Sequence, residues 1–358
     1  MINQLYHTWI KQIQQLRPKE RITRVRTLAW MMMGMFQSKS VHLSKIAVKI
    51  PGKAKTLSID RRLRRFVNND AVDALEWYQP VAQTWIAWQA QSTGQIRLIM
   101  DGTKIGCGYQ LLIVALAFRR RAVPIAWRWV KKKQSKGHSS TEVHLELLRS
   151  IYHLIPNHLS VLVVGDTEFG RVELMRQLEQ WGWQYVLRLR EYFRLREPHQ
   201  TQWVHPTELL TKPGQSRWMG HIALFEKHAH PTHIGAYWKM GEERPWFLAT
   251  NLPALQPTLR SYRRRAWIEE MFGDWKGHGV DVERTRLLHP QRLSRLILAV
   301  VLLFNWLLTL GVQTIRNGNR PYVDRTDRRD LSVFQIGLRF LDRALTNDLP
   351  VAVRLCPC

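Results

Sequence analysis

Acidic residues and cysteines are both scarce in this sequence. Its 358 residues include 28 Asp and Glu against 54 Lys and Arg, which gives a formal net charge of +26 at pH 7. With only three cysteines, Cys107, Cys356 and Cys358, the composition is not that of a disulfide-stapled secreted domain. The terminal Cys-Pro-Cys also lacks the other ligands that a zinc site needs. We therefore expect a protein of a reducing, cytoplasmic compartment.

Long apolar runs are also rare. Residues 1–19 show no signal-peptide pattern, and the apolar run at 28–36 is too short and too internal to be one. Residues 296–312 form an uncharged stretch at the lower edge of membrane-spanning length. The stretch contains Asn305, and a helix that is apolar all round is also typical of a large α/β core. We predict a buried core helix there and no membrane partner.

The positive charge is gathered in clusters. A chain with such an excess neutralises phosphates, so we predict a nucleic-acid partner and binding that weakens as salt rises. Within the amino-terminal part, we assign DNA binding to Arg61, Arg62, Arg64 and Arg65. The clusters are residues 60–66, 119–121, 131–133, 263–265 and 325–329.

A single predicted helix over residues 261–276 carries the most informative pattern. Four of its polar side chains are separated from the first by 3, 7 and 14 residues, so they share one side at about 100° per residue. A carboxylate on that side suits a metal ion, whereas guanidinium and ammonium groups suit phosphate oxygens. We therefore predict that this side does not face the core. The four residues are Tyr262, Arg265, Glu269 and Lys276.

Glu270 is the competitor of Glu269 on this helix. It lies about 100° further round, away from Arg265 and Lys276. We therefore prefer Glu269 as the chemically active carboxylate.

Two apolar runs with strand-like composition each end in an aspartate. Residues 96–103 stop at Asp101 with Gly102 beside it, and residues 160–169 repeat the pattern at Asp166. Taken alone, such an aspartate also fits a turn or a helix cap. Together with a helix-borne glutamate, two strand-end carboxylates would supply oxygen ligands for one or two magnesium ions. Paired ions of this kind suit in-line displacement at phosphorus.

With these residues, the sequence resembles the DDE transposases of bacterial insertion sequences, specifically the type-4 insertion-sequence family. The third acid of that family lies in a Y-x2-R-x3-E-x6-K motif, which the four helix residues fit without a gap. Asp101 matches the first acid and Asp166 the second. The resemblance covers about residues 95–310 and is vaguer before them.

The resemblance implies an activity and a set of site residues. Catalytic Asp101, Asp166 and Glu269 would bind two Mg²⁺ ions, with Mn²⁺ able to replace them. Water would nick the end of the element, and the freed 3′ hydroxyl would attack the opposite strand to form a hairpin. The resolved end would then join target DNA. The remaining motif residues would hold phosphates around a flipped base; they are Tyr262, Arg265 and Lys276.

The resemblance also implies partners and a location. DNA would be bound both as terminal inverted repeats and as target, by a homodimer at the bacterial nucleoid. Two other functions stay open on the sequence. One is a ribonuclease H-like endonuclease without strand transfer, and the other is a non-catalytic DNA-binding protein derived from a transposase.

The predicted fold class is α/β. Residues 1–95 look helical, and the later pattern gives three antiparallel strands at 96–103, 109–118 and 122–130. A helix near 140–154, the Asp166 strand, a helix near 170–181 and a strand at 183–190 complete a β-β-β-α-β-α order. The resemblance identifies this order as ribonuclease H-like. The predicted domains are a helical DNA-binding domain (1–95), a ribonuclease H-like catalytic core (96–190 and 256–315), a proline-rich, mostly β insertion (191–255) and a C-terminal tail (316–358).

The insertion holds two groups of residues with ligand-binding chemistry. Its tryptophans are predominantly core residues by type, but the resembled family uses one aromatic ring to hold an extruded base. Its histidine run lacks a matching cysteine or carboxylate set, which favours a polar turn over a metal site. The tryptophans are Trp203, Trp218, Trp238 and Trp246, and the histidines are His228, His230 and His233.

Overall fold

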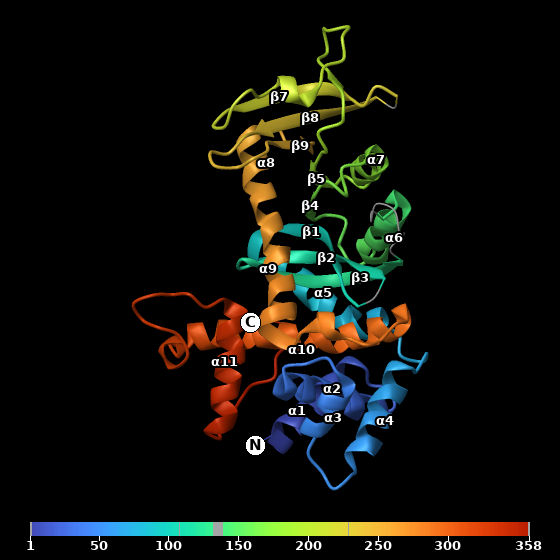
Figure 1. The fold of residues 1–358 in the computed structure, drawn as a ribbon, viewed down its shortest axis with the longest axis vertical. Coiled ribbons are helices and arrows are strands. Elements are labelled where there is room, and N and C mark those ends of the chain that lie inside the picture. Colours follow the sequence, from blue (N-terminus) through green and yellow to red (C-terminus); the bar gives the residue numbers. More distant parts are fainter. Residues whose placement is uncertain (1, 107, 132–138, 228, 357–358) are drawn as a thin grey trace. The chain divides into compact units, whose positions relative to one another are not determined.

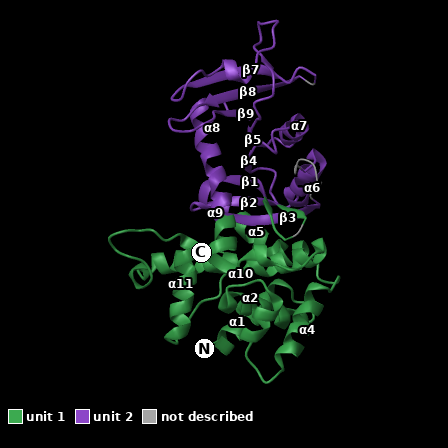
Figure 2. Cartoon of the chain, viewed as in Figure 1, with its two compact units in different colours: residues 1–88, 103–111, 271–358 green, residues 89–102, 112–270 purple. Residues whose placement is uncertain are grey.

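A computed structural model describes residues 2–106, 108–131, 139–227 and 229–356 (Figure 1). The chain divides into two compact units (Figure 2). The first comprises residues 1–88, 103–111 and 271–358, and the second comprises residues 89–102 and 112–270. Some residues named above lie outside the described ones: Cys107, Lys132, Lys133, His228 and Cys358.

A mixed β-sheet forms the framework of the second unit. Its strand order is β3-β2-β1-β4-β5-β9-β8-β7-β6 in the described part of the chain. β1 pairs with β4 and β4 with β5 in parallel, whereas β5 pairs with β9 in antiparallel orientation. The strands are β1 (Gln95–Lys104), β2 (Tyr109–Phe118), β3 (Arg121–Lys131), β4 (Ser160–Gly165), β5 (Gln184–Arg188), β6 (Leu195–Arg196), β7 (Ser216–Leu224), β8 (His230–Tyr237) and β9 (Trp246–Thr250).

The predicted elements between residues 96 and 190 are confirmed to within a few residues. The central strand β4 is buried along five of its six residues, because helices cover both faces of the sheet. Figure 1 shows α6 (Thr141–Tyr152) and α7 (Val172–Gln180) on one face and α8 (Leu255–Tyr262) on the other. Between α8 and the sheet lies an apolar cluster that includes Leu162, Val186 and Leu259.

The β-rich segment that interrupts the core pattern continues the same sheet. β9 pairs with β5 on one side and with β8 on the other. Strands β6 to β9 therefore extend the framework on which the candidate site is built.

The first unit is helical. Its longest described helix, α10 (Pro290–Arg316), is long and apolar enough by composition to cross a membrane, but 94% of its most apolar window is buried. It packs against α2, α4 and α11, as expected of a core helix. The other helices are α1 (Ile2–Leu16), α2 (Ile22–Ser38), α3 (Leu43–Lys49), α4 (Thr56–Val67), α5 (Ala74–Thr93), whose last residues belong to the second unit, and α11 (Val333–Thr346).

A buried arginine fixes the end of α4. The Arg295 guanidinium, on α10, donates to the carbonyl oxygens of Val67 at 3.0 Å and Val72 at 2.9 Å, and to the Asp70 carboxylate at 2.7 Å. A cation at the C-terminal end of a helix satisfies carbonyl groups that have no partner within the helix. Its hydrogen bonds hold α4, which carries the predicted DNA-binding arginines, against the core of the first unit.

The single helix predicted over residues 261–276 is wrong. α8 ends at Tyr262, a 3₁₀ turn follows over Arg263–Arg265, and α9 occupies Ala266–Trp275 before a π-helical turn over Lys276–Val280. The angle per residue differs in each of these turns, so the shared side that was calculated for the four polar side chains on an ideal α-helix does not hold. The π turn needs glycine at position 279, because a Cβ atom there would lie 2.2 Å from the Asp274 carbonyl oxygen.

Candidate active site

The two predicted aspartates lie side by side, although β1 does not stop at Asp101 as predicted but continues to Lys104. β1 and β4 run parallel with Met100 opposite Gly165, so the next residue of each strand, Asp101 and Asp166, follows at the same edge of the sheet. The carboxyl ends of neighbouring parallel strands are where α/β proteins place their ligands. The sheet thus brings together the first two predicted acids.

Burial and mutual repulsion mark both carboxylates. Asp101 is 9% exposed, and one of its oxygens accepts a hydrogen bond from the Gly102 amide at 2.7 Å. Burial first, and then the charge of Asp166, raise the pKa of Asp101 to about 7, even though Arg265 acts to lower it. Burial also raises the pKa of Asp166. A positive charge placed between two such carboxylates would relieve their repulsion.

Arg265 joins the third acid to the first. Its Nη1 lies 3.2 Å from Asp101 Oδ2, and its Nη2 lies 2.5 Å from Glu269 Oε1. The Glu269 side chain is 54% exposed, so it forms the open side of the site. Glu270 instead pairs with Arg121 at 3.2 Å. The structure therefore brings Glu269, and not Glu270, into contact with Arg265.

The donor set fits a hard divalent cation. Within the described ranges, no three His, Cys, Asp or Glu side chains are gathered closely enough to hold a metal ion as they stand. Arg265 already bonds to Asp101 and Glu269, and a cation entering there would have to displace at least one of these ion pairs. Carboxylate oxygens are nevertheless the ligands that magnesium prefers, and the repulsion of Asp101 by Asp166, which Arg265 only partly offsets, would favour a bound cation.

A polar network behind Asp166 was missed by sequence reasoning. The Glu168 amide donates to Asp166 Oδ1 at 2.9 Å. The Glu168 carboxylate in turn accepts hydrogen bonds from the Ser139 amide, at 2.9 Å, and from the Ser139 hydroxyl. His144 Nε2 lies 2.6 Å from that hydroxyl. The only signal in the sequence was a second acid two residues after Asp166. In the structure, Glu168 fixes the turn that orients the Asp166 carboxylate.

The comparisons with known proteins decide the family. The family model of the transposase DDE domain matches residues 95–306, more than half of the chain. This chain belongs to the DDE transposases. Members of the family cleave DNA by phosphoryl transfer and generally use divalent metal ions. No curated protein matches the sequence.

One solved structure aligns with the whole transposase chain. It is the cryo-electron microscopy structure of a piggyBac transposase synaptic complex with hairpin DNA. The alignment covers 98% of this chain and 84% of that chain, with 11% sequence identity and a TM-score of 0.42. A likeness of that strength supports no inference about this transposase.

Tyr262 departs from the prediction that its side of the helix avoids the core. It is 3% exposed and belongs to the apolar cluster beneath α8. Its ring meets Trp246 edge-on at 5.0 Å between ring centroids. Burial raises the pKa of its hydroxyl, and the charges of Arg265 and Arg188, together with a hydrogen bond from Arg188, partly offset that rise. The tyrosine is buried because its ring completes the packing between helix and sheet.

Lys276 and the α4 arginines belong to the first unit. Lys276, in the π turn, pairs with Glu283 at 2.7 Å. On α4, all four predicted arginines are exposed. Arg64 pairs with Asp60 at 2.6 Å, and Arg62 lies over the Trp30 ring at 4.8 Å. In the part of the chain that the structure describes, the other two make no ion pair; they are Arg61 and Arg65.

The polar turn predicted for the histidine run is wrong for its described members. His230 and His233 lie in strand β8. His230 is buried against Glu179 at 3.3 Å, and His233 Nδ1 accepts from the His221 amide at 3.0 Å. The strand forms because these residues pair with β7 and β9.

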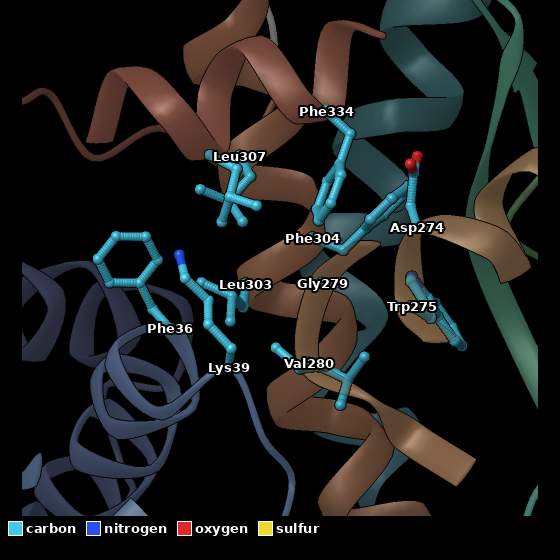
Figure 3. A pocket seen from close by; sticks show the side chains of 12 residues that line it. Phe36, Lys39, Asp274, Trp275, Gly279, Val280, Leu303, Phe304, Leu307 and Phe334 are labelled. Carbon is cyan, nitrogen blue, oxygen red and sulfur yellow. The ribbon is translucent and has the colours of Figure 1, made fainter. Parts of the chain in front are cut away.

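An apolar cavity in the first unit is too small to be a ligand site. Its volume is about 10 Å³, no more than a single water molecule needs. Figure 3 shows that it is lined chiefly by apolar side chains, among them Phe304, Leu307 and Phe334. We regard it as a packing defect of the helical core.

Proposed function

We propose that this chain is the transposase of a bacterial insertion sequence of the type-4 family. It would cut DNA at the terminal inverted repeats of the element, pass through a hairpin on each end, and join the resolved ends to target DNA. A homodimer in the DNA complex would carry out these steps at the nucleoid in the cytoplasm. The helical residues 1–95 would bind the ends, and a ribonuclease H-like core with the β insertion would perform the chemistry.

One observation carries this proposal. The parallel pair β1 and β4 delivers Asp101 and Asp166 to the same edge of the sheet, and Arg265 links Asp101 to Glu269. All three acids lie within the segment matched by the transposase family model. Three carboxylates around a buried edge favour phosphoryl transfer over a purely DNA-binding role.

The protein's own groups have separable tasks. Asp101, Asp166 and Glu269 would hold two Mg²⁺ ions, or Mn²⁺ in their place, which when bound activate the attacking oxygen and stabilise the leaving oxygen. Glu168 holds the Asp166 carboxylate in position through its amide. Arg265, once released from an acid, would contact a phosphate oxygen. Lys276 would complete the phosphate contacts around a flipped base, whereas Tyr262 is buried in the cluster beneath α8 and would support the turn that carries Arg265.

The test uses DNA from both flanks of the gene, searched for short inverted repeats. With Mg²⁺, purified protein should nick the ends, give a slow hairpin band on a denaturing gel, and join the ends to a target plasmid. Cleavage without joined product would identify an endonuclease that lacks strand transfer. Binding without cleavage in Mg²⁺ or Mn²⁺ would identify a non-catalytic DNA-binding protein.

The α4 arginines provide a prediction with an internal control. Replacing Arg61 and Arg65 by Gln should lower the slope of log affinity against log salt by about 0.9 for each lost phosphate contact. Replacing Arg62 and Arg64 should lower it less, because Trp30 and Asp60 already engage them.

Fluorescence anisotropy with end DNA over a salt series measures both slopes. Equal slopes in the wild type and in both paired variants would remove α4 from the DNA interface.

A further inference from the structure

Three arginines of the second unit lie near one another, and none of them forms an ion pair with a described residue. Arg97 comes from β1, Arg260 from α8, and Arg264 from the 3₁₀ turn that follows α8. They are separate from the residues of the candidate site. Arg97 and Arg264 are half-buried, and Arg260 is exposed.

The backbone places these three side chains on one side of the sheet. Arg97 is in register with Leu162, which belongs to the apolar cluster beneath α8, so its side chain lies on the face that α8 covers. Arg260 lies in α8 and Arg264 in the 3₁₀ turn that follows it, and both of these elements contact β4, the strand beside β1. Burial lowers the pKa of Arg264, and the nearby charges of Arg97 and Arg260 lower it further.

None of the three makes an ion pair among the described residues. Arg97 has one side-chain hydrogen bond, from its Nε to the Gln95 amide oxygen at 3.1 Å. Other arginines of the same unit are paired, for example Arg128 with Glu146 at 2.5 Å. Like charges that lie together without a counter-ion oppose folding. A bound anion would neutralise these three guanidinium groups, so their arrangement favours an anion-binding site.

The cluster lies on the same face of β1 as the catalytic edge. Arg97 and Asp101 are four residues apart, and alternate residues of a strand share a face. At about 3.3 Å per residue, the two Cα atoms are about 13 Å apart along the strand. Along the axis of a duplex one strand advances about 3.4 Å per nucleotide, and its phosphates are further apart than that, so this separation spans at most about four nucleotides.

We propose that Arg97, Arg260 and Arg264 bind one backbone phosphate of the DNA substrate, within about four nucleotides of the reacting phosphate. This assignment rests on the proposed function for the identity of the substrate. It adds a second anchor on the catalytic unit, which would fix the register of the DNA strand relative to the carboxylates.

The test is DNA binding by the double variant Arg97→Gln/Arg264→Gln in the full chain. With a fluorescein-labelled duplex of arbitrary sequence, the slope of log affinity against log salt should fall by about 0.9. Arg97→Lys/Arg264→Lys keeps the charge and should keep the slope. The matched control is Arg176→Gln, an exposed arginine on α7 that covers the other face of the sheet, and it should also keep the slope.

Thermal melting separates this role from a structural one. Without DNA, the Gln double variant should melt at or above the wild-type temperature, because repulsion between guanidinium groups is relieved. Added duplex should raise the melting temperature of the wild type more than that of the variant.

Four outcomes would overturn the site. In the binding assay, the first two are an unchanged salt slope in the Gln double variant and an equal fall of that slope in Arg176→Gln. The third is a Gln double variant that melts below the wild type together with a Lys double variant that also loses slope. The fourth is an increase in the melting temperature of the wild type with inorganic phosphate as large as that with duplex. Neither measurement needs cleavage. A wild type that fails to cut DNA in Mg²⁺ would contradict the proposed function and leave the phosphate site standing.

Discussion

Asp101→Ala, Asp166→Ala and Glu269→Ala should each abolish metal-dependent nicking while DNA affinity changes by no more than a few-fold. The carboxylates are assigned to the metal ions and not to DNA, so their loss removes the chemistry and leaves the basic surfaces intact. Removing negative charge beside DNA should, if anything, tighten binding. Nicking of labelled end DNA in Mg²⁺ and anisotropy with the same DNA measure the two effects.

Glu270→Ala is the matched control for this series. Glu270 is the sequence neighbour of Glu269, but its carboxylate pairs with Arg121 and not with Arg265. Its replacement should leave most of the nicking rate. Retained cleavage in any of the three alanine variants would remove that residue from the site, and an essential Glu270 beside a dispensable Glu269 would reverse the assignment on α9.

Arg265→Ala should separate metal binding from catalysis. In the structure the guanidinium bonds to Asp101 and Glu269, where it competes with any cation that uses the same oxygens. Its removal should therefore leave Mn²⁺ binding as tight as in the wild type, or tighter. Cleavage should nevertheless fall by about 10²–10³-fold, the effect of losing one donor that stabilises charge in a transition state.

Arg263→Ala is the control for Arg265. Arg263 lies in the same 3₁₀ turn but is exposed, with its guanidinium 6.0 Å from the Tyr237 ring centroid. It should retain near-normal cleavage. Loss of both Mn²⁺ binding and cleavage in Arg265→Ala would mean that Arg265 supports the positions of the acids and does not act on the substrate.

The sequence was most informative where an apolar run of characteristic length could be recognised together with the residues at its end. The sequence predicted two apolar strands that stop at Asp101 and Asp166. β4 does end just before Asp166, whereas β1 continues past Asp101 to Lys104; the parallel pairing of β1 with β4 nevertheless places the two acids side by side. The uncharged stretch at 296–312 was correctly predicted as a buried helix, because its length and composition suit a core.

What the sequence could not predict depends on contacts between distant residues. The 3₁₀ and π turns that divide the helix around Glu269 follow from tertiary packing, which an ideal helical period does not contain. The burial of Tyr262 follows from Leu162 and Val186, which are distant in the sequence. The Glu168 network depends on Ser139, 29 residues away.

The central claim is that Asp101 and Asp166 hold divalent metal ions. Electron paramagnetic resonance of Mn²⁺, titrated with protein in the presence of duplex DNA, tests it most directly, because the signal of free Mn²⁺ disappears on binding. We predict that the wild type removes this signal and that Asp101→Asn/Asp166→Asn, with its fold checked by circular dichroism, leaves it. Equal loss of the free-ion signal in both proteins would contradict the assignment of these aspartates as metal ligands.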